Sequence, residues 1–137
     1  MKVILMGEPQ TIMDNPLGKH KYFGWPTVAR LQNGKIAVMA SGYRRRHVCP
    51  FGKAVIAYSA DEGCTYTRPA PVIDTVLDDR DTGLCPFGQS GLIITSFNNT
   101  RKMHRDLILT PDFYHDADDW LKNATPDKAF RLAYLDM

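Results

Sequence analysis

Short apolar stretches separated by tight turns restrict this chain to an all-β fold more strongly than any other feature of its sequence. The stretch 27–31 is followed by Asn33-Gly34, a strong hairpin signal because both residues tolerate positive φ. The stretch 35–41 then returns as a nearly all-apolar strand, which predicts burial on both of its faces. Two further strands follow, over 53–59 and around 71–74. Short or polar connections join the four strands, so we expect an antiparallel meander.

The same pattern starts again in the second half of the chain and is not completed. A weak strand is expected over 84–87, because Pro86 disfavours a central position, and an apolar strand over 92–97. Further on, strands are expected over 107–109 and 129–135, and a helical turn within 111–122. We therefore expect one partial domain over 1–137, with a first unit at about 22–76 and an incomplete second unit at about 82–137.

The turn after the third strand carries a recognisable motif. Its residues are Ser59, Ala60, Asp61, Glu62, Gly63, Cys64, Thr65 and Tyr66. Asp61 is placed to accept hydrogen bonds from the turn backbone, Gly63 supplies positive φ, and Thr65 ties the exit of the turn. The aromatic ring of Tyr66 is then expected to pack against the strand pair. An ordinary Asp-Gly hairpin is the alternative interpretation.

These eight residues match the Asp-box, Ser-x-Asp-x-Gly-x-Thr-Trp, with Tyr66 in place of Trp. Together with the flanking stretches 22–31, 33–36 and 68–71, the motif resembles the first blade of bacterial sialidases and related Asp-box (BNR repeat) proteins. The resemblance covers roughly residues 20 to 97. It implies a six-bladed β-propeller built from four-stranded antiparallel meanders, of which one and a half to two blades are present. It also implies that the Asp-box is structural and lies opposite the ligand-binding face.

Charged residues fall in alternate connections. Because successive connections of a meander lie at opposite ends of the sheet, Asn33-Gly34 and the Asp-box share one end. The other end receives the segment 20–25, the loop 44–47, the linker 78–81 and the loop 101–106. We therefore expect the densest charge in the chain to gather at one end.

The candidate site residues come from these connections. Arg44, Arg45 and Arg46 are candidates for binding an anionic group of a substrate, and His47 for proton transfer near neutral pH. Asp79 and Asp81 are candidate acid/base residues, with Arg80 keeping them ionised, and Trp25 is a candidate for stacking on a sugar ring. The alternatives are a solvated arginine loop, a salt-bridged linker and a core aromatic residue.

The resemblance implies a mechanism that this chain only partly supports. Sialidases grip the substrate carboxylate with three arginines, and use an Asp as acid/base and a Tyr activated by a Glu as nucleophile. Gly24 stands where the first arginine is expected, and the loop with His47 contains no acid. The nucleophile comes from later blades in that family. We expect this chain alone to be inactive.

Composition excludes several classes of partner and cofactor. The net charge of +2 does not favour nucleic acid or membrane as a partner. Cys49, Cys64 and Cys85 lack zinc-ligand spacing, and the acidic stretch 112–119 lacks the pattern of a calcium loop, so no metal or other cofactor is expected. The N-terminal apolar run is too short for a signal peptide, so the chain as written is expected in the cytoplasm.

Two hypotheses for function follow, and a third concerns assembly. The first is a fragment of a sialidase-like glycoside hydrolase that acts on or binds an acidic glycan. The second is a non-catalytic Asp-box module that binds carbohydrate or protein. The third is self-assembly into a closed propeller, a homo-oligomer formed through uncovered blade edges.

Overall fold

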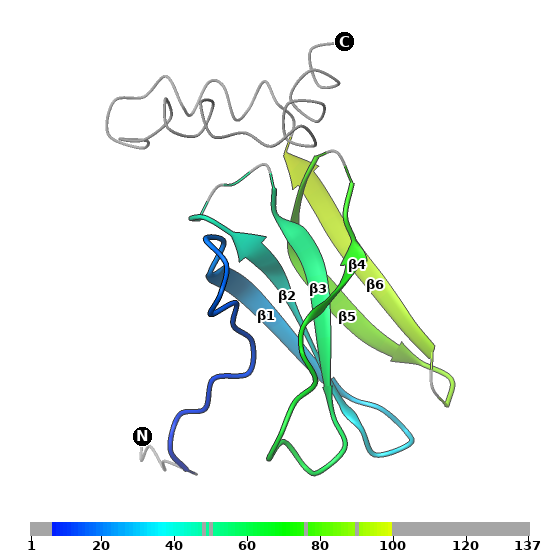
Figure 1. Cartoon of the computed structure of the whole chain (residues 1–137). Helices are drawn as coiled ribbons and strands as arrows, with labels where there is room; N and C mark the ends of the chain where they lie inside the picture. The colour runs from blue at the N-terminus through cyan, green and yellow to red at the C-terminus, as the bar shows by residue number, and fades with distance from the viewer. Residues whose placement is uncertain (1–6, 48, 50, 76, 90, 100–137) are drawn as a thin grey trace, which may run out of the picture.

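Six β-strands form two antiparallel sheets in the part of the chain that the structure describes. In this computed structural model, residues 7–47, 49, 51–75, 77–89 and 91–99 are described. The first sheet has the order β1 (Tyr22–Arg30), β2 (Ile36–Arg44), β3 (Lys53–Ser59), β4 (Ala70–Ile73), and the second pairs β5 (Asp78–Phe87) with β6 (Gly91–Asn99) (Figure 1). The predicted all-β class and the four-stranded meander are confirmed.

The hydrophobic core lies between the two sheets. Every second side chain along β2 and β3 points toward the second sheet. Leu84, Leu92 and Ile94 of the second sheet pack against these side chains. The buried members of this cluster are Leu31, Ala37, Met39, Ala54 and Ile56. Apolar burial of this kind is the main source of the free energy that stacks two sheets.

The opposite face of the first sheet is also buried, as the all-apolar composition of β2 and β3 predicted. Val38 and Ala40 of β2 are 4% and 3% exposed, and Val55 and Ala57 of β3 are both 0% exposed. The segment before β1 covers part of this face and leaves an apolar hollow of about 210 Å³. The hollow is lined by Gln10, Ile12, Met13, Phe23, Gly24, Pro26, Val38 and Ala40.

The second sheet begins earlier than expected. Residues 78–81 were expected to form a linker, but they are the first residues of β5, with Asp79 opposite Asn98 and Arg80 opposite Phe97. A run of four charged residues is unusual in a strand, and here side chains from three other segments bind it. The expected features at 101–106, 107–109, 111–122 and 129–135 lie outside the described residues.

The Asp-box turn has the hydrogen bonds that its sequence predicted. Ser59 Oγ donates to Asp61 Oδ1 at 2.8 Å and accepts the Gly63 N–H at 2.8 Å. Asp61 Oδ1 accepts the Thr65 N–H at 2.8 Å, and Oδ2 accepts the Thr65 hydroxyl at 2.5 Å. Gly63 has a φ of 90°, which explains the glycine at this position. Tyr66 is half-buried, with its hydroxyl close to Gly63.

These bonds change the acidity of the turn. Hydrogen bonds from the Thr65 hydroxyl, then from the Thr65 N–H and the Ser59 hydroxyl, lower the pKa of Asp61 from 3.8 to about 2. A carboxylate that is more acidic in the folded than in the unfolded state stabilises the fold above its unfolded pKa. The Asp61 contribution is therefore complete above about pH 4 and is lost as the pH falls through about 2.

We predict that NMR titration of the folded protein will give Asp61 a pKa of about 2. The substitution Thr65→Val removes the hydroxyl donor that lowers the pKa most, so it should move this pKa upward toward the ordinary value. Thr67→Val is the control, because the Thr67 hydroxyl accepts the Tyr58 N–H instead. An Asp61 pKa that is the same in the wild type and in Thr65→Val would contradict this account of the turn.

Candidate functional site

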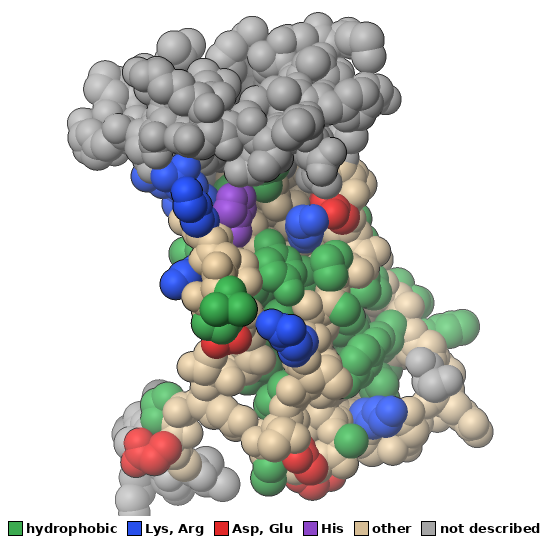
Figure 2. Space-filling view, viewed as in Figure 1, with side chains coloured by type: hydrophobic (Ala, Val, Ile, Leu, Met, Phe, Trp, Pro, Cys, Tyr) green, Lys and Arg blue, Asp and Glu red, His purple; other side chains and the backbone are tan. Residues whose placement is uncertain are grey.

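The charged connections of the described chain lie at one end of the sheets, as predicted. In Figure 1 the β1–β2 turn and the Asp-box turn are at the lower end, and the β2–β3 and β4–β5 connections are at the upper end. Figure 2 shows Lys, Arg and His side chains near the upper end, with an acidic side chain beside one of them; both signs of charge also occur lower down. We call the upper group the charged end. It consists of Trp25, Ser41, Arg44, Arg45, Arg46, His47, Cys49, Asp78, Asp79, Arg80, Asp81 and Asn98.

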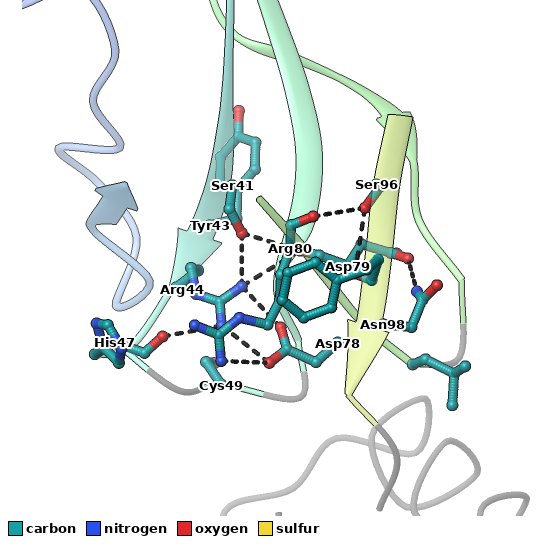
Figure 3. A network of polar contacts seen from close by, with 12 residues as sticks. Ser41, Tyr43, Arg44, His47, Cys49, Asp78, Asp79, Arg80, Ser96 and Asn98 are labelled. Carbon is teal, nitrogen blue, oxygen red and sulfur yellow. Dashed lines mark hydrogen bonds and ion pairs between the residues drawn. The ribbon is translucent and has the colours of Figure 1, made fainter. Parts of the chain in front are cut away.

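Arg44 is the centre of the charged end and is fully buried. Its Nη1 lies 2.7 Å from Asp78 Oδ1, and its Nη2 donates to Asp78 Oδ2 at 3.0 Å. Both side chains are 0% exposed. The same guanidinium donates to Ser41 Oγ at 2.6 Å and to the His47 carbonyl at 3.0 Å (Figure 3). Arg44 therefore joins the end of β2, the following loop and the first residue of β5.

Asp79 is also fully buried, and groups of the same chain bind its carboxylate. Oδ2 accepts the Thr75 N–H at 2.7 Å, and Oδ1 accepts the Thr75 hydroxyl at 2.9 Å and the Asn98 amide. Its main chain is bound as well: the N–H donates to the Gly52 carbonyl at 3.2 Å, and the carbonyl accepts the Ser41 hydroxyl at 2.9 Å. Asp79 thus fixes the β4–β5 connection to its neighbours.

Trp25 packs among the cationic and imidazole groups of the charged end. The Cζ atoms of Arg80 and Arg44 lie 4.8 Å and 5.3 Å from the centre of its ring. The His47 ring meets it edge-on with 4.8 Å between the ring centres. Such contacts with an aromatic face stabilise guanidinium groups that have left water. The ring is half-buried, so part of it is accessible.

Three of the four non-glycine residues with positive φ in the described chain lie in this region, and the fourth, Glu62, is in the Asp-box turn. Trp25, Tyr43 and Asp81 have φ values of 53°, 52° and 43°, in the left-handed region that non-glycine residues rarely adopt. Trp25 lies in the irregular part of β1 between Tyr22 and Thr27, Tyr43 lies opposite it in β2, and Asp81 lies in the irregular part of β5 between Arg80 and Gly83. Strained residues of this kind cluster at functional sites, where the surrounding structure holds them in place.

Arg80 and Asp81 retain unused hydrogen-bonding capacity. Arg80 is 8% exposed, and its Nη1 lies 3.8 Å from Asp78 Oδ2, a loose ion pair. Its Nε and the Asp81 Oδ1 are buried and have no hydrogen-bond partner. Buried polar atoms without partners cost free energy unless water or a ligand binds them. The Nε of Arg44, the Oδ1 of Asp78 and the Oγ1 of Thr82 are likewise buried and form no hydrogen bond.

The remaining predicted residues lie closer to solvent. Arg45 and Arg46 are half-buried and His47 is exposed. The Arg45 N–H donates to the buried Cys49 Sγ at 3.4 Å, and burial raises the pKa of the Cys49 thiol. Of the three consecutive arginines, Arg44 has a different environment from the other two, a difference that the sequence does not signal.

Several residues of this network were not predicted as site residues. Asp78 and Ser41 bind Arg44, and Thr75 and Asn98 bind Asp79. The sequence signal that could have identified Asp78 is its position: it is a charged residue that begins a strand soon after a short edge strand. The other three are a serine within β2, a threonine in the β4–β5 connection and an asparagine near the end of β6, with no distinguishing pattern.

The described residues contain no group of three or more His, Cys, Asp or Glu side chains placed to hold a metal ion. Among these same residues, no helix has the length and hydropathy that crossing a membrane requires. Comparison with protein-family models, characterised proteins and solved structures finds no significant match to this chain. The assignment of function therefore depends on the geometry of the charged end and on the Asp-box turn.

Gly52 is predicted to be indispensable for the buried ion pair. A Cβ atom there would lie 2.0 Å from Arg44 Nη1 and 2.5 Å from Asp78 Oδ1, so Gly52→Ala must displace the pair. Disrupting a buried ion pair costs about 3 to 5 kcal/mol, and we expect a loss of this size in urea denaturation. Gly7→Ala, with nothing within 4 Å, is the control and should change stability by less than about 0.5 kcal/mol. Equal stability of the two variants would show that the pair does not occupy this space.

Proposed function

We propose that this chain is part of an Asp-box β-propeller and that its charged end binds an acidic glycan without hydrolysing it. The observation that carries the proposal is the state of the two acids at the start of β5. Asp78 is ion-paired with Arg44, and Thr75 and Asn98 bind Asp79, with both acids 0% exposed. A carboxylate fixed in this way cannot reach a glycosidic oxygen, and a general acid must do so.

Other features support the propeller part of the proposal. The first sheet is a four-stranded meander with the Asp-box between β3 and β4, which is the arrangement that the sequence resemblance implies for one blade. The second sheet stacks on it through apolar side chains, as neighbouring blades of a propeller would. The proposed ligand-binding face is then the charged end, opposite the Asp-box turn.

The chemistry of the charged end favours an anionic ligand. Arg44, Arg45, Arg46 and Arg80 carry four positive charges at this end, and Asp78, Asp79 and Asp81 carry three negative charges, so the balance is +1. The half-buried Trp25 ring provides an apolar face beside them, and a pyranose ring stacks on such a face. A carboxylate or sulfate group on the sugar would pair with guanidinium groups through charge-assisted hydrogen bonds.

The catalytic alternative has one residue in its favour. Asp81 is half-buried and its Oδ1 forms no hydrogen bond, but this oxygen is itself buried, so it must become exposed before it can act as an acid. A nucleophile is harder to find among the described residues. Tyrosine is the residue type that serves as nucleophile in sialidases. The Tyr43 hydroxyl, however, already donates a hydrogen bond to the Pro69 carbonyl at 2.8 Å. Binding is therefore the function that the geometry supports best.

We predict that the protein binds 3′-sialyllactose more tightly than lactose in calorimetry. The double variant Arg45→Ala/Arg46→Ala should bind 3′-sialyllactose at least about tenfold more weakly, because the loss of one charge-assisted contact has an effect of this size. Arg68→Ala is the matched control, because this exposed arginine lies in the connection at the Asp-box end. Equal affinity for the acidic and the neutral sugar would refute the proposal.

We also predict no release of a fluorogenic aglycone from a sialoside by the purified chain. Turnover that disappears in Asp81→Asn but persists in Asp79→Asn would establish the hydrolase alternative in place of the binding module. Both substitutions keep the shape of the side chain and remove its ability to transfer a proton.

A further inference from the structure

The Asn33-Gly34 turn joins β1 to β2 at the same end of the sheet as the Asp-box turn (Figure 1). The Leu31 N–H donates to the Lys35 carbonyl at 2.8 Å, and the Leu31 carbonyl accepts the Gly34 N–H at 3.0 Å. Residues 32–34 therefore form the loop of the hairpin, and Gly34 supplies its positive φ of 85°. Gln32, Asn33 and Gly34 are exposed, and the proposed function makes no use of them.

The Asn33 side chain folds over the peptide bond to Gly34. Its Oδ1 accepts the Lys35 N–H at 3.1 Å, which makes an Asx turn. The ring that this hydrogen bond closes contains both the Asn33 Cγ and the Gly34 nitrogen, so the side chain cannot rotate away from that nitrogen while the bond lasts. The Lys35 N–H also donates to the oxygen on which negative charge develops when a nucleophile attacks Cγ.

The Gly34 peptide group is open to solvent. A Cβ atom at Gly34 would meet no atom within 4 Å, so no neighbouring group of the described chain crowds this side of the turn. The Gly34 N–H must leave the Leu31 carbonyl before the nitrogen can react. Hydrogen bonds in exposed turns open at a low cost in free energy, so the folded protein visits the open form repeatedly.

We propose that Asn33 is a site of spontaneous modification, where the side-chain amide is hydrolysed through a cyclic imide. Solvent base removes the proton from the Gly34 nitrogen, the nitrogen attacks Cγ, and the side-chain nitrogen takes up a proton and leaves as ammonia. One water molecule then opens the five-membered imide. Opening at Cγ gives aspartate, and opening at the main-chain carbonyl gives isoaspartate, whose main chain passes through Cβ and Cγ. The inference does not depend on the glycan proposal.

Two other asparagines of the described chain lack this arrangement. Asn15 precedes Pro16, whose nitrogen carries no hydrogen to lose and cannot form the imide. The Nδ2 of Asn98 donates to the buried Asp79 carboxylate, and the residue that follows it has a side chain. These two asparagines therefore serve as internal controls for the reaction at Asn33.

Isoaspartate at position 33 would change the hairpin more than aspartate would. It adds one carbon atom to the main chain of a tight loop, which disturbs the two hydrogen bonds of Leu31 that close the loop. Both products add a negative charge next to Gly34, whose carbonyl accepts the Arg30 Nη1 at 3.3 Å. We expect the β1–β2 hairpin to loosen at the Asp-box end in the isoaspartate form.

Peptide mapping of the full chain by mass spectrometry tests the proposal. In folded protein kept at mildly alkaline pH, the peptide with Asn33 should gain the mass of an amide-to-acid exchange and separate into an aspartate and an isoaspartate species. A higher pH should speed the gain, because the Gly34 nitrogen must lose its proton first. Asn15 and Asn98 should keep their amides over the same period. The chain unfolded in guanidinium chloride is the positive control for the chemistry.

Two variants sharpen the test. Asn33→Gln keeps an amide but would have to close a six-membered ring, so the mass gain should be lost. Freshly purified Asn33→Asp has the charge of the products and an ordinary main chain, so it should unfold at a higher urea concentration than the isoaspartate fraction. An Asn33 amide that survives in the folded chain after the unfolded chain has reacted would overturn the proposal. An equal mass gain in Asn33→Gln, or at Asn98, would overturn it as well.

Discussion

The ion pair between Arg44 and Asp78 is the interaction on which the arrangement of this structure depends. The two residues are 34 positions apart in sequence and belong to different sheets. Neither side chain is exposed to solvent. Removing two charges from water costs several kcal/mol per ion, and the pair repays this only with good geometry and further hydrogen bonds. Here Ser41 and two main-chain carbonyls supply those bonds. The pair fixes how the second sheet meets the first.

This structural role determines what the charged end is able to do. The two acids that the chain places deepest are held by Arg44, Thr75 and Asn98 and are not available for proton transfer. Trp25, Arg80 and Asp81 remain, together with the strained backbone at two of these residues. We therefore propose that this surface, with its guanidinium groups and aromatic ring, holds an anionic sugar. Among the described residues, Asp78 and Asp79 are not free to act as the two proton-transfer carboxyl groups that most glycoside hydrolases use.

The sequence predicts local features of this fold well and long-range ones poorly. Asn33-Gly34 and the Ser59–Tyr66 motif specify turns whose hydrogen bonds lie within a few residues, so both could be placed from the sequence. The parity of a meander then placed the charged connections at one end. The start of β5 was missed because Asp78 and Asp79 look solvated until distant partners are known. For the same reason Arg44 was not separated from Arg45 and Arg46, although its environment is that of a core residue.

A double-mutant cycle on Arg44 and Asp78 tests the central claim most directly. The variants Arg44→Met, Asp78→Asn and the double variant would be compared with the wild type in urea denaturation at pH 7. We predict that each single substitution costs about 3 kcal/mol or more, because it leaves a buried charge without its partner. The double variant should cost no more than either single one, which corresponds to a coupling energy of at least about 3 kcal/mol. Additive losses, or single losses below about 0.5 kcal/mol, would show that the pair does not hold the sheets together.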